Sequence, residues 1–384
     1  MTSYLGARAA IITTAMIFGL MYSLSAALIA LDLAGRGLSE GMIGANAAMH
    51  AVGVLAMAIV LPRMTARLGM RPTIVGSLLV SAVLIVLFPA MPSVWLWFPL
   101  RVALGAASEI LFVLSETWLN ALSTDETRAR TMGGYVAALS IGLALGPLIL
   151  LSVGTSGFLP YSTGAVLALV AAGFVMSPGI KAPVFERPAH GNPVRYMRLA
   201  PIAMGAAALN AAIETAGLTF FTLYSVSMGW DEAQAMQLMP CMMLGAIVLQ
   251  IPIGWLGDKM NRQHLIVALA GLSAVGALIW PWALQSPWLT FGLLFIWGGL
   301  FVGIYTIMLT IVGSRFAGGD LVGIYAGMGL TWGAGALVGP ILAGMAMQAV
   351  PHGLALFAAG ACLLFMILAL AVKSETASVS VLKE

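Results

Sequence analysis

The sequence has very few charged residues: Asp, Glu, Lys and Arg together make up 8% of its 384 residues. A soluble globular domain carries about 25%, so the composition argues against a water-soluble fold. Hydrophobic residues make up 61% of the chain, which is typical of a protein whose surface faces lipid. The scarcity of charge therefore places this chain in a membrane.

Cysteine is also scarce, and several functional signatures are missing. Cys241 and Cys362 lie in separate apolar runs without CxxC or Cys/His spacing, which excludes a disulfide framework or a zinc site. The sequence has no phosphate-binding P-loop and no Ser/His/Asp arrangement of recognisable spacing. Basic runs interleaved with aromatic residues are absent as well. We therefore expect neither an enzyme nor a metal protein, and no nucleic-acid partner.

Long apolar runs dominate what is present. A helix that crosses a bilayer needs roughly 20 apolar residues, and twelve such runs occur, separated by short turns rich in Gly and Pro. They lie at about residues 8–31, 41–61, 73–91, 95–120, 131–153, 160–179, 199–226, 232–256, 264–284, 288–312, 321–347 and 351–372. No Ala-x-Ala cleavage site follows the first run, so we expect a retained span. The sequence predicts an all-α membrane protein with twelve transmembrane helices.

The second half of the chain repeats the first. The basic stretch at residues 62–71 and the stretch at 254–262 both lie between the second and third spans of their half, and they align with an offset of 192 residues. This pattern fits two parallel halves of a transporter related by an axis along the membrane normal. We predict six-helix bundles at residues 1–180 and 199–373, a cytoplasmic linker at 181–198 and a cytoplasmic tail at 374–384.

The basic residues indicate the orientation. With the N-terminus inside, 15 of the 17 Lys and Arg fall in inner loops and termini, whereas Arg36 is outside and Arg101 lies within a span. Since cytoplasmic loops carry the excess of Lys and Arg, both termini are predicted to be cytoplasmic. We expect a monomer in the lipid bilayer of the cytoplasmic (inner) membrane.

The two repeated stretches read as charged turns. The second contains Gly254, Asp258, Lys259 and Arg262, and the first keeps Arg67, Gly69 and Arg71 but has Pro62 and Ala66 in place of the Gly and Asp. Such a turn can bridge neighbouring helix ends by charged hydrogen bonds, which predicts an inner-gate latch built on Asp258, Lys259 and Arg262. Alternatively, the basic residues only hold the loop inside.

Two spans contain glycine repeats that end in proline. Span 5 has Gly142, Gly146 and Pro147, and span 11 has Gly339 and Pro340. Glycines let two helices approach closely, and a proline allows a bend by removing a hydrogen bond. These residues are predicted to set the helix bends of a transport cycle, with ordinary helix packing as the alternative.

These patterns resemble the major facilitator superfamily. The stretches at 62–71 and 254–262 are similar to its motif A, residues 101–105 to its motif B, and residues 133–147 to the antiporter motif of the drug:proton branch, with Leu150 and Leu151 where that motif ends in Gly-Gly. The chain is also similar to short YcaD-type permeases. The resemblance implies alternating access of two halves driven by a proton gradient, with no cofactor.

Ionisable groups inside spans are costly and usually functional. In span 4, Arg101, Glu109 and Glu116 project toward one side at helical spacing. Glu109 is the deepest and is predicted to carry a proton or to bind substrate. Glu116 is either a further proton-coupling residue or a structural cap, and Arg101 either pairs with a carboxylate or binds an anionic group.

Span 7 carries Asn210 and Glu214 on one helical face. By analogy with the superfamily, spans 1, 4, 7 and 10 line the cavity, so Glu214 faces span 4. A poorly solvated site disfavours the charged carboxylate. The resulting hypothesis is that Glu109 or Glu214 loads a proton outside and releases it inside. His50 in span 2 is more typical of a packing residue.

Aromatic residues complete the predicted substrate site. Tyr22, Trp297, Tyr305 and Trp332 are predicted to line a cavity for a flat or apolar ligand, together with Arg101, Asn210 and Glu214. The chain also has 24 Met, and the run at 239–243 places Met and Cys sulfur atoms at a spacing that could bind a soft metal such as copper. Span 7 has no second pair of Met residues to complete such a site. Because Met also commonly fills gaps in apolar packing, copper transport is a minor alternative.

Three functional classes remain. The leading one is proton-coupled efflux of a small amphipathic molecule by alternating access. The second is proton-coupled import of a small anionic metabolite that is anchored on Arg101. The third, a membrane receptor that does not transport, has no supporting motif. Many aromatic residues favour export, while an unpaired Arg101 favours an anion.

Overall fold

The computed structural model describes residues 2–122, 125–177, 180, 182, 197–315 and 318–372. All regular secondary structure in these ranges is helical, and each predicted span coincides with a helix. The first half contains α1 (Thr2–Gly35), α2 (Glu40–Leu68), α3 (Met70–Ala90), the 3-10 turn η1 (Val94–Leu96), α4 (Trp97–Ala121), α5 (Asp125–Val153) and α6 (Leu159–Met176). The second half contains α8 (Pro201–Ser227), α9 (Glu232–Val248), α10 (Gln250–Lys259), α11 (Arg262–Ala283), α12 (Pro287–Arg315), α13 (Gly318–Ala349) and α14 (Gly353–Ala371).

Most of these helices are long enough to cross a membrane. Eleven segments of the described chain have the necessary length and apolar composition, and α5 contributes a shorter apolar part, Ala137–Val153. Helices α9 and α10 together form one predicted span, interrupted at Leu249. Only helices satisfy every backbone hydrogen bond within one segment in lipid. The predicted all-α membrane fold is confirmed.

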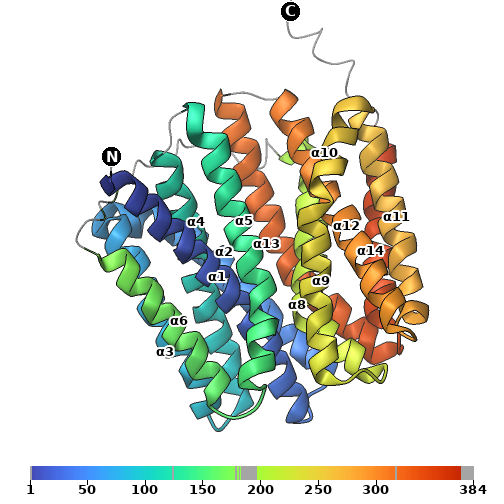
Figure 1. The fold of residues 1–384 in the computed structure, drawn as a ribbon, viewed down its shortest axis with the longest axis horizontal. Coiled ribbons are helices and arrows are strands. Elements are labelled where there is room, and N and C mark those ends of the chain that lie inside the picture. Colours follow the sequence, from blue (N-terminus) through green and yellow to red (C-terminus); the bar gives the residue numbers. More distant parts are fainter. Residues whose placement is uncertain are drawn as a thin grey trace, which may run out of the picture.

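The helices form two bundles that lie side by side (Figure 1). In the first, α1 packs on α5, α2 on α4, and α3 on α6; in the second, α8 packs on α13, α9 on α12, and α11 on α14. These pairs correspond one to one under the repeat. The predicted linker lies almost entirely outside the described residues, and the predicted tail lies wholly outside them.

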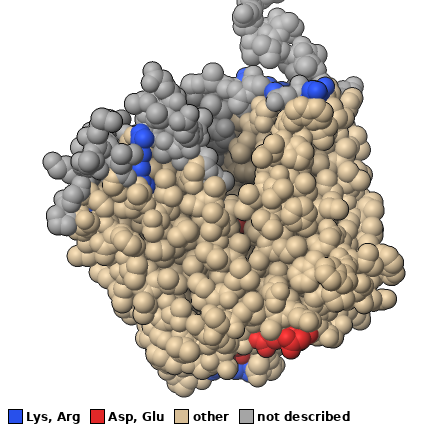
Figure 2. Space-filling model, in the orientation of Figure 1, with Lys and Arg blue, Asp and Glu red and all other residues tan. Residues whose placement is uncertain are grey.

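Helix α1 begins and α14 ends at the same end of the bundle, the upper end in Figure 1. We call this the basic end, because Arg67, Arg71, Lys259 and Arg262 lie there. In Figure 2 blue side chains lie along this end, and red side chains gather near the opposite end of the visible face.

The two stretches that read as charged turns are mostly helical, so this prediction is wrong for most of their length. Residues 62–68 belong to α2 and residues 254–259 to α10. The first helix stops at Gly69, whose φ of 85° favours glycine. The second stops at Met260, and Asn261 then caps α11 by accepting hydrogen bonds from the Gln263 and His264 amides. A helix continues through charged residues until a residue with cap geometry ends it.

The predicted glycine repeats lie where helices touch. A Cβ on Gly142 in α5 would be 2.0 Å from the Met16 carbonyl oxygen of α1, and a Cβ on Gly339 in α13 would be 2.4 Å from the Ala212 carbonyl oxygen of α8. Both glycines therefore provide close backbone contact within one half. Their contribution to a transport cycle stays a prediction.

The two halves are pressed together toward the opposite end. A Cβ on Gly44 of α2 would lie 2.2 Å from the Pro340 carbonyl oxygen of α13, and one on Gly344 would lie 2.4 Å from the Glu40 carbonyl oxygen. The Thr155 hydroxyl, from the turn after α5, donates to the carboxylate of Glu232 at the start of α9. The seam between the halves is closed at this end.

Candidate functional site

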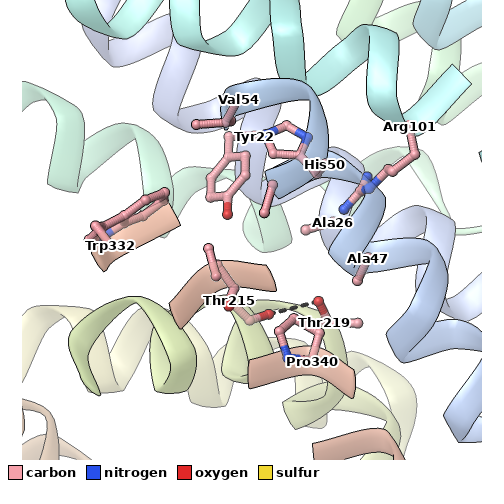
Figure 3. A pocket seen from close by; sticks show the side chains of 12 residues that line it. Tyr22, Ala26, Ala47, His50, Val54, Arg101, Thr215, Thr219, Trp332 and Pro340 are labelled. Atoms are coloured by element: carbon pink, nitrogen blue, oxygen red, sulfur yellow. Dashed lines mark hydrogen bonds between the residues drawn. The ribbon is translucent and has the colours of Figure 1, made fainter. Parts of the chain in front are cut away.

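A small pocket lies at the seam between the two halves (Figure 3). Helices α1, α2 and α4 of the first half and α8 and α13 of the second form its walls. Its lining consists of Tyr22, Ala26, Ala47, His50, Ala51, Val54, Arg101, Thr215, Thr219, Trp332, Ala336 and Pro340. The cavity volume is about 10 Å³, close to what one water molecule requires. In this conformation the walls have nearly closed on one another.

Arg101 brings a buried cation into this pocket. Its side chain is 3% exposed and its Nε has no hydrogen-bond partner. One Nη1 contact, to the Ser25 carbonyl oxygen, is long at 3.5 Å. Within the described part of the chain, the ion pair found within 4.0 Å joins Asp32 to Arg36 and does not involve Arg101. Leaving a buried polar group without a partner costs roughly 1–3 kcal/mol, and more when the group is charged, so Arg101 is available to an anion.

His50 and Tyr22 accompany this cation. His50 is 7% exposed, and its Nδ1 has no hydrogen-bond partner. The ring centroids of His50 and Tyr22 are 5.1 Å apart, and Arg101 acts electrostatically on both side chains. The sequence pattern favoured a packing role for His50, whereas the structure places it in the pocket wall. The first half thus contributes a cation, an imidazole and a phenol.

The second half contributes acceptors and an indole. The hydroxyl groups of Thr215 and Thr219 donate to the Ala211 and Thr215 carbonyl oxygens at 2.6 and 2.7 Å. Their hydrogens are committed to α8, and the oxygen lone pairs remain to accept a hydrogen bond. Trp332 lies at the end of the pocket away from Arg101, as Figure 3 shows. Sequence reasoning missed both threonines, although their i, i+4 spacing beside Glu214 was a usable signal.

Glu214 lies next to the pocket on α8. Asn210 donates a hydrogen bond to its Oε2 at 3.0 Å. The two side chains thus lie on one face of α8, as the i, i+4 spacing predicted. Glu214 also acts electrostatically on Tyr22 across the seam. A carboxylate of the second half therefore acts electrostatically on a phenol of the first half that lines the pocket.

The charges of α4 do not act as one group. Glu109 and Glu116 are partly buried and act electrostatically on each other. Glu116 also acts on Tyr135, whose hydroxyl lies 3.2 Å from the Ser115 hydroxyl. Arg101 interacts instead with Tyr22, Tyr161 and His50. The carboxylates and the cation of this helix thus have separate partners.

Trp297 and Tyr305 of α12 do not belong to the pocket. Trp297 is 1% exposed, donates from Nε1 to the Ser273 carbonyl oxygen at 2.7 Å, and stacks on Phe301. It packs within the second half and does not line the seam pocket. Its role in substrate binding stays a prediction. Tyr305 is partly buried against the same core. Trp297 faces its own bundle because α12 packs on α9 and α11.

The predicted gating residues whose side chains the structure describes make different contacts. The Lys259 ammonium lies 3.9 Å from the centroid of the Trp255 ring, and the Arg262 Nε donates to the Gly257 carbonyl oxygen. Arg67 is exposed, and the Asp258 side chain lies outside the described residues. Arg71 donates to carbonyl oxygens at the end of α6 in its own half. A latch on Asp258 stays a prediction.

Residues of the Met- and Cys-containing run at 239–243 take part in helix packing. The Cys241 Sγ donates to the Phe291 carbonyl oxygen, and Met242 lies against Gly298 of α12. In the part of the chain that the structure describes, no three His, Cys, Asp or Glu side chains form a group that could hold a metal. These contacts add nothing to the copper alternative.

Comparisons of the sequence with known proteins all lead to one family of membrane transporters. The sequence profile of the Major Facilitator Superfamily matches residues 10–329 and, in a second alignment, 202–383. The chain is 24% identical over 321 residues to the uncharacterised MFS-type transporter YfkF of Bacillus subtilis, covering 82% of this chain and 81% of YfkF. It is 24% identical over 336 residues to the uncharacterised MFS-type transporter YcaD of Salmonella enteritidis, with 84% of each chain covered.

Solved structures show the same architecture. The crystal structure of the nucleoside transporter NupG aligns with a TM-score of 0.77 at 13% identity, covering 97% of this chain and 99% of NupG. A D-xylose–proton symporter aligns with a TM-score of 0.73 at 14% identity, covering 95% of this chain and 97% of the symporter. At these identities the likeness concerns the fold alone.

Proposed function

The chain belongs to the Major Facilitator Superfamily, and on that premise we propose that it is a proton-coupled secondary transporter. In this proposal a small amphipathic molecule crosses the membrane through the pocket at the seam, by alternating access of the two halves. The proton gradient supplies the energy, and Glu214 carries the coupled proton. The basic end faces the cytoplasm, in keeping with the excess of Lys and Arg in cytoplasmic loops.

The position of Glu214 carries this proposal. It belongs to the second half, is hydrogen-bonded by the uncharged Asn210, and acts on Tyr22 of the first half. A charged carboxylate opposes closure of an apolar seam because burying an unpaired charge is costly. Binding a proton removes that cost. The halves can then close over a neutral Glu214, which links proton binding to the change of access.

The shape of the molecule is consistent with one state of such a cycle. The halves touch closely at the end opposite the basic end, whereas the visible face is hollowed between them near the basic end (Figure 2). A protein that is closed on one side and hollowed on the other needs only a rocking of its halves to exchange access. With the basic end in the cytoplasm, this conformation faces inward.

Two directions of transport are candidates. Export by proton antiport is favoured by the similarity of residues 133–147 to the antiporter motif and by the close packing of Gly142 on α1. Import by proton symport of a small anion is favoured by the unpaired, buried Arg101. Both directions would use the same pocket and the same carboxylate. They differ in the direction in which the proton moves, so an assay of proton movement distinguishes them.

The test uses purified protein in liposomes that contain a pH-sensitive dye, with candidate solutes of each charge class added outside. Symport acidifies the lumen when a solute enters, and antiport makes it more alkaline. We expect Glu214→Gln to abolish the pH change, while the control Glu232→Gln, which keeps an acceptor for Thr155, leaves it unchanged. Protein-free liposomes correct for passive entry of weak acids.

Either of two results would overturn the proposal. The first is solute flux in the wild-type protein without any proton movement. The second is normal coupling in Glu214→Gln, because Glu214 would then not carry the coupled proton.

A further inference from the structure

We propose that the seam pocket binds a small planar monoanion, an aromatic or conjugated carboxylate that carries an O–H or N–H group on its ring. This inference rests on the proposed function, since it takes the pocket to be the transport site. It adds the chemical class of the solute, and it follows from three features of the pocket wall.

The first feature is the charge of the wall. Arg101 is the one charged side chain among the twelve lining residues. A guanidinium presents paired N–H groups that match a carboxylate or phosphate in a fork geometry. Its Nε and the Nδ1 of His50 are both buried and unpartnered. One cation balances one negative charge, so the pocket favours a monoanionic carboxylate over a dianionic phosphate ester.

The second feature is the order of the side chains along the pocket. In Figure 3 Arg101 lies at one end, Trp332 at the other, and Tyr22 between them. A carboxylate held by Arg101 therefore places the body of the ligand beside a phenol ring and an indole ring. Aromatic faces favour flat, apolar partners. Alanines at positions 26, 47, 51 and 336 form much of the remaining wall, and these small side chains leave room for a ring once the halves separate slightly.

The third feature is the acceptor pair on α8. The hydroxyl hydrogens of Thr215 and Thr219 are used within the helix, so these oxygens accept hydrogen bonds from a ligand. A ligand that carries a hydroxyl or amino group satisfies them, whereas a methyl group in the same place does not. In Figure 3 both threonines lie on the α8 wall across from Tyr22, with Thr219 nearer to Arg101 than Thr215 is. The pocket therefore discriminates between substituents on the side of the ligand that faces α8.

The test measures binding to the purified full-length protein in detergent, by ligand-induced thermal stabilisation and by calorimetry. The probes are 4-hydroxybenzoate, 4-aminobenzoate, 4-methylbenzoate, benzoate, benzamide, benzylamine and phenyl phosphate. We expect the two donor-bearing carboxylates to bind best, followed by benzoate and 4-methylbenzoate. Benzamide and benzylamine, which carry no negative charge, should not bind detectably.

Variants assign the roles of the residues. Arg101→Gln should weaken binding of 4-hydroxybenzoate by about 10- to 100-fold, the range for a hydrogen bond to a charged group. The double variant Thr215→Val with Thr219→Val should leave benzoate affinity unchanged but remove the preference for the 4-hydroxyl group, which we expect to be roughly fivefold. Glu232→Gln, at the closed end of the seam and outside the pocket lining, is the control and should bind all probes as the wild type does.

The inference is overturned if benzamide binds as tightly as benzoate, or if Arg101→Gln keeps the wild-type affinity for a carboxylate. Failure of this inference and failure of the proposed function are distinguishable. Arg101-dependent carboxylate binding without proton movement in liposomes refutes only the coupling. Proton-coupled movement of a neutral or cationic solute that is indifferent to Arg101 refutes only the solute class.

Discussion

Arg71 and Gln263 perform the same structural task in the two halves of this protein. The Arg71 guanidinium donates to the carbonyl oxygens of Val175, Met176 and Ser177 at the end of α6. The Gln263 amide donates to the carbonyl oxygens of Ala369 and Val372 at the end of α14. The two residues are 192 positions apart, which is the offset of the repeat. The structural counterpart of Arg71 is thus Gln263 and not the neighbouring Arg262.

Arg71→Ala should destabilise the protein because it removes the partners of three helix-terminal carbonyl groups. We expect a loss of roughly 2–4 kcal/mol in the free energy of unfolding, against roughly 1–2 kcal/mol for Gln263→Ala. Arg71→Gln should lose less than Arg71→Ala, since an amide performs this task in the other half. The measurement is denaturant-induced unfolding in mixed micelles. Arg67→Ala, at an exposed position, is the matched control, and equal losses in Arg67→Ala and Arg71→Ala would contradict the assignment.

Gly142→Ala and Gly339→Ala should each push two helices apart. The added Cβ would come within 2.0 and 2.4 Å of a backbone carbonyl oxygen, and backbone cannot move aside as a side chain can. Overpacking of this kind costs roughly 1–3 kcal/mol. We expect lower thermal stability and a smaller monodisperse fraction in size-exclusion chromatography. Gly76→Ala, where nothing lies within 4 Å of the added atom, should behave as the wild type, and equal behaviour of all three variants would refute the packing role.

Joining Thr155 to Glu232 should stop transport. These residues come from different halves and meet at the closed end of the seam. Cysteines at both positions, in a background with Cys241→Ala and Cys362→Ala, can be linked by a short cleavable thiol reagent. We expect linked protein to lose solute flux and cleaved protein to recover it, while each single cysteine variant keeps its flux after treatment. Full flux in the linked protein would show that this end does not open.

Trp297→Phe and Trp332→Phe should have opposite effects. Trp297→Phe removes the hydrogen bond to the Ser273 carbonyl oxygen in the core of the second half. We expect a loss of roughly 1–2 kcal/mol of stability with unchanged solute affinity. Trp332→Phe alters the pocket wall and should change solute affinity with little loss of stability. Binding titrations and unfolding curves on both variants check this pair, and a changed affinity in Trp297→Phe would return that residue to the substrate site.

The positions of the spans could be predicted closely from sequence. The run predicted at 351–372, for example, corresponds to α14 at Gly353–Ala371. The rotation of each helix was harder to predict. One face of a membrane helix contacts lipid and the other contacts protein, and both are apolar, so periodicity does not separate them. This is why Trp297 was assigned to the pocket and why Thr215 and Thr219 were overlooked.

Composition and spacing predict that this chain spans a membrane, that its halves repeat, and that most of its basic residues gather at one end. Lipid leaves the backbone no alternative to helices long enough to span it, and most charged residues lie at the ends of those helices because an ionisable group inside the membrane is costly. Which polar groups lie together at the seam depends on how the helices pack. Arg101 and Glu109 belong to the same helix, α4, but have different partners. Arg101 lies beside Tyr22 of α1 and His50 of α2. Such neighbours depend on how distant helices pack, which no local pattern contains.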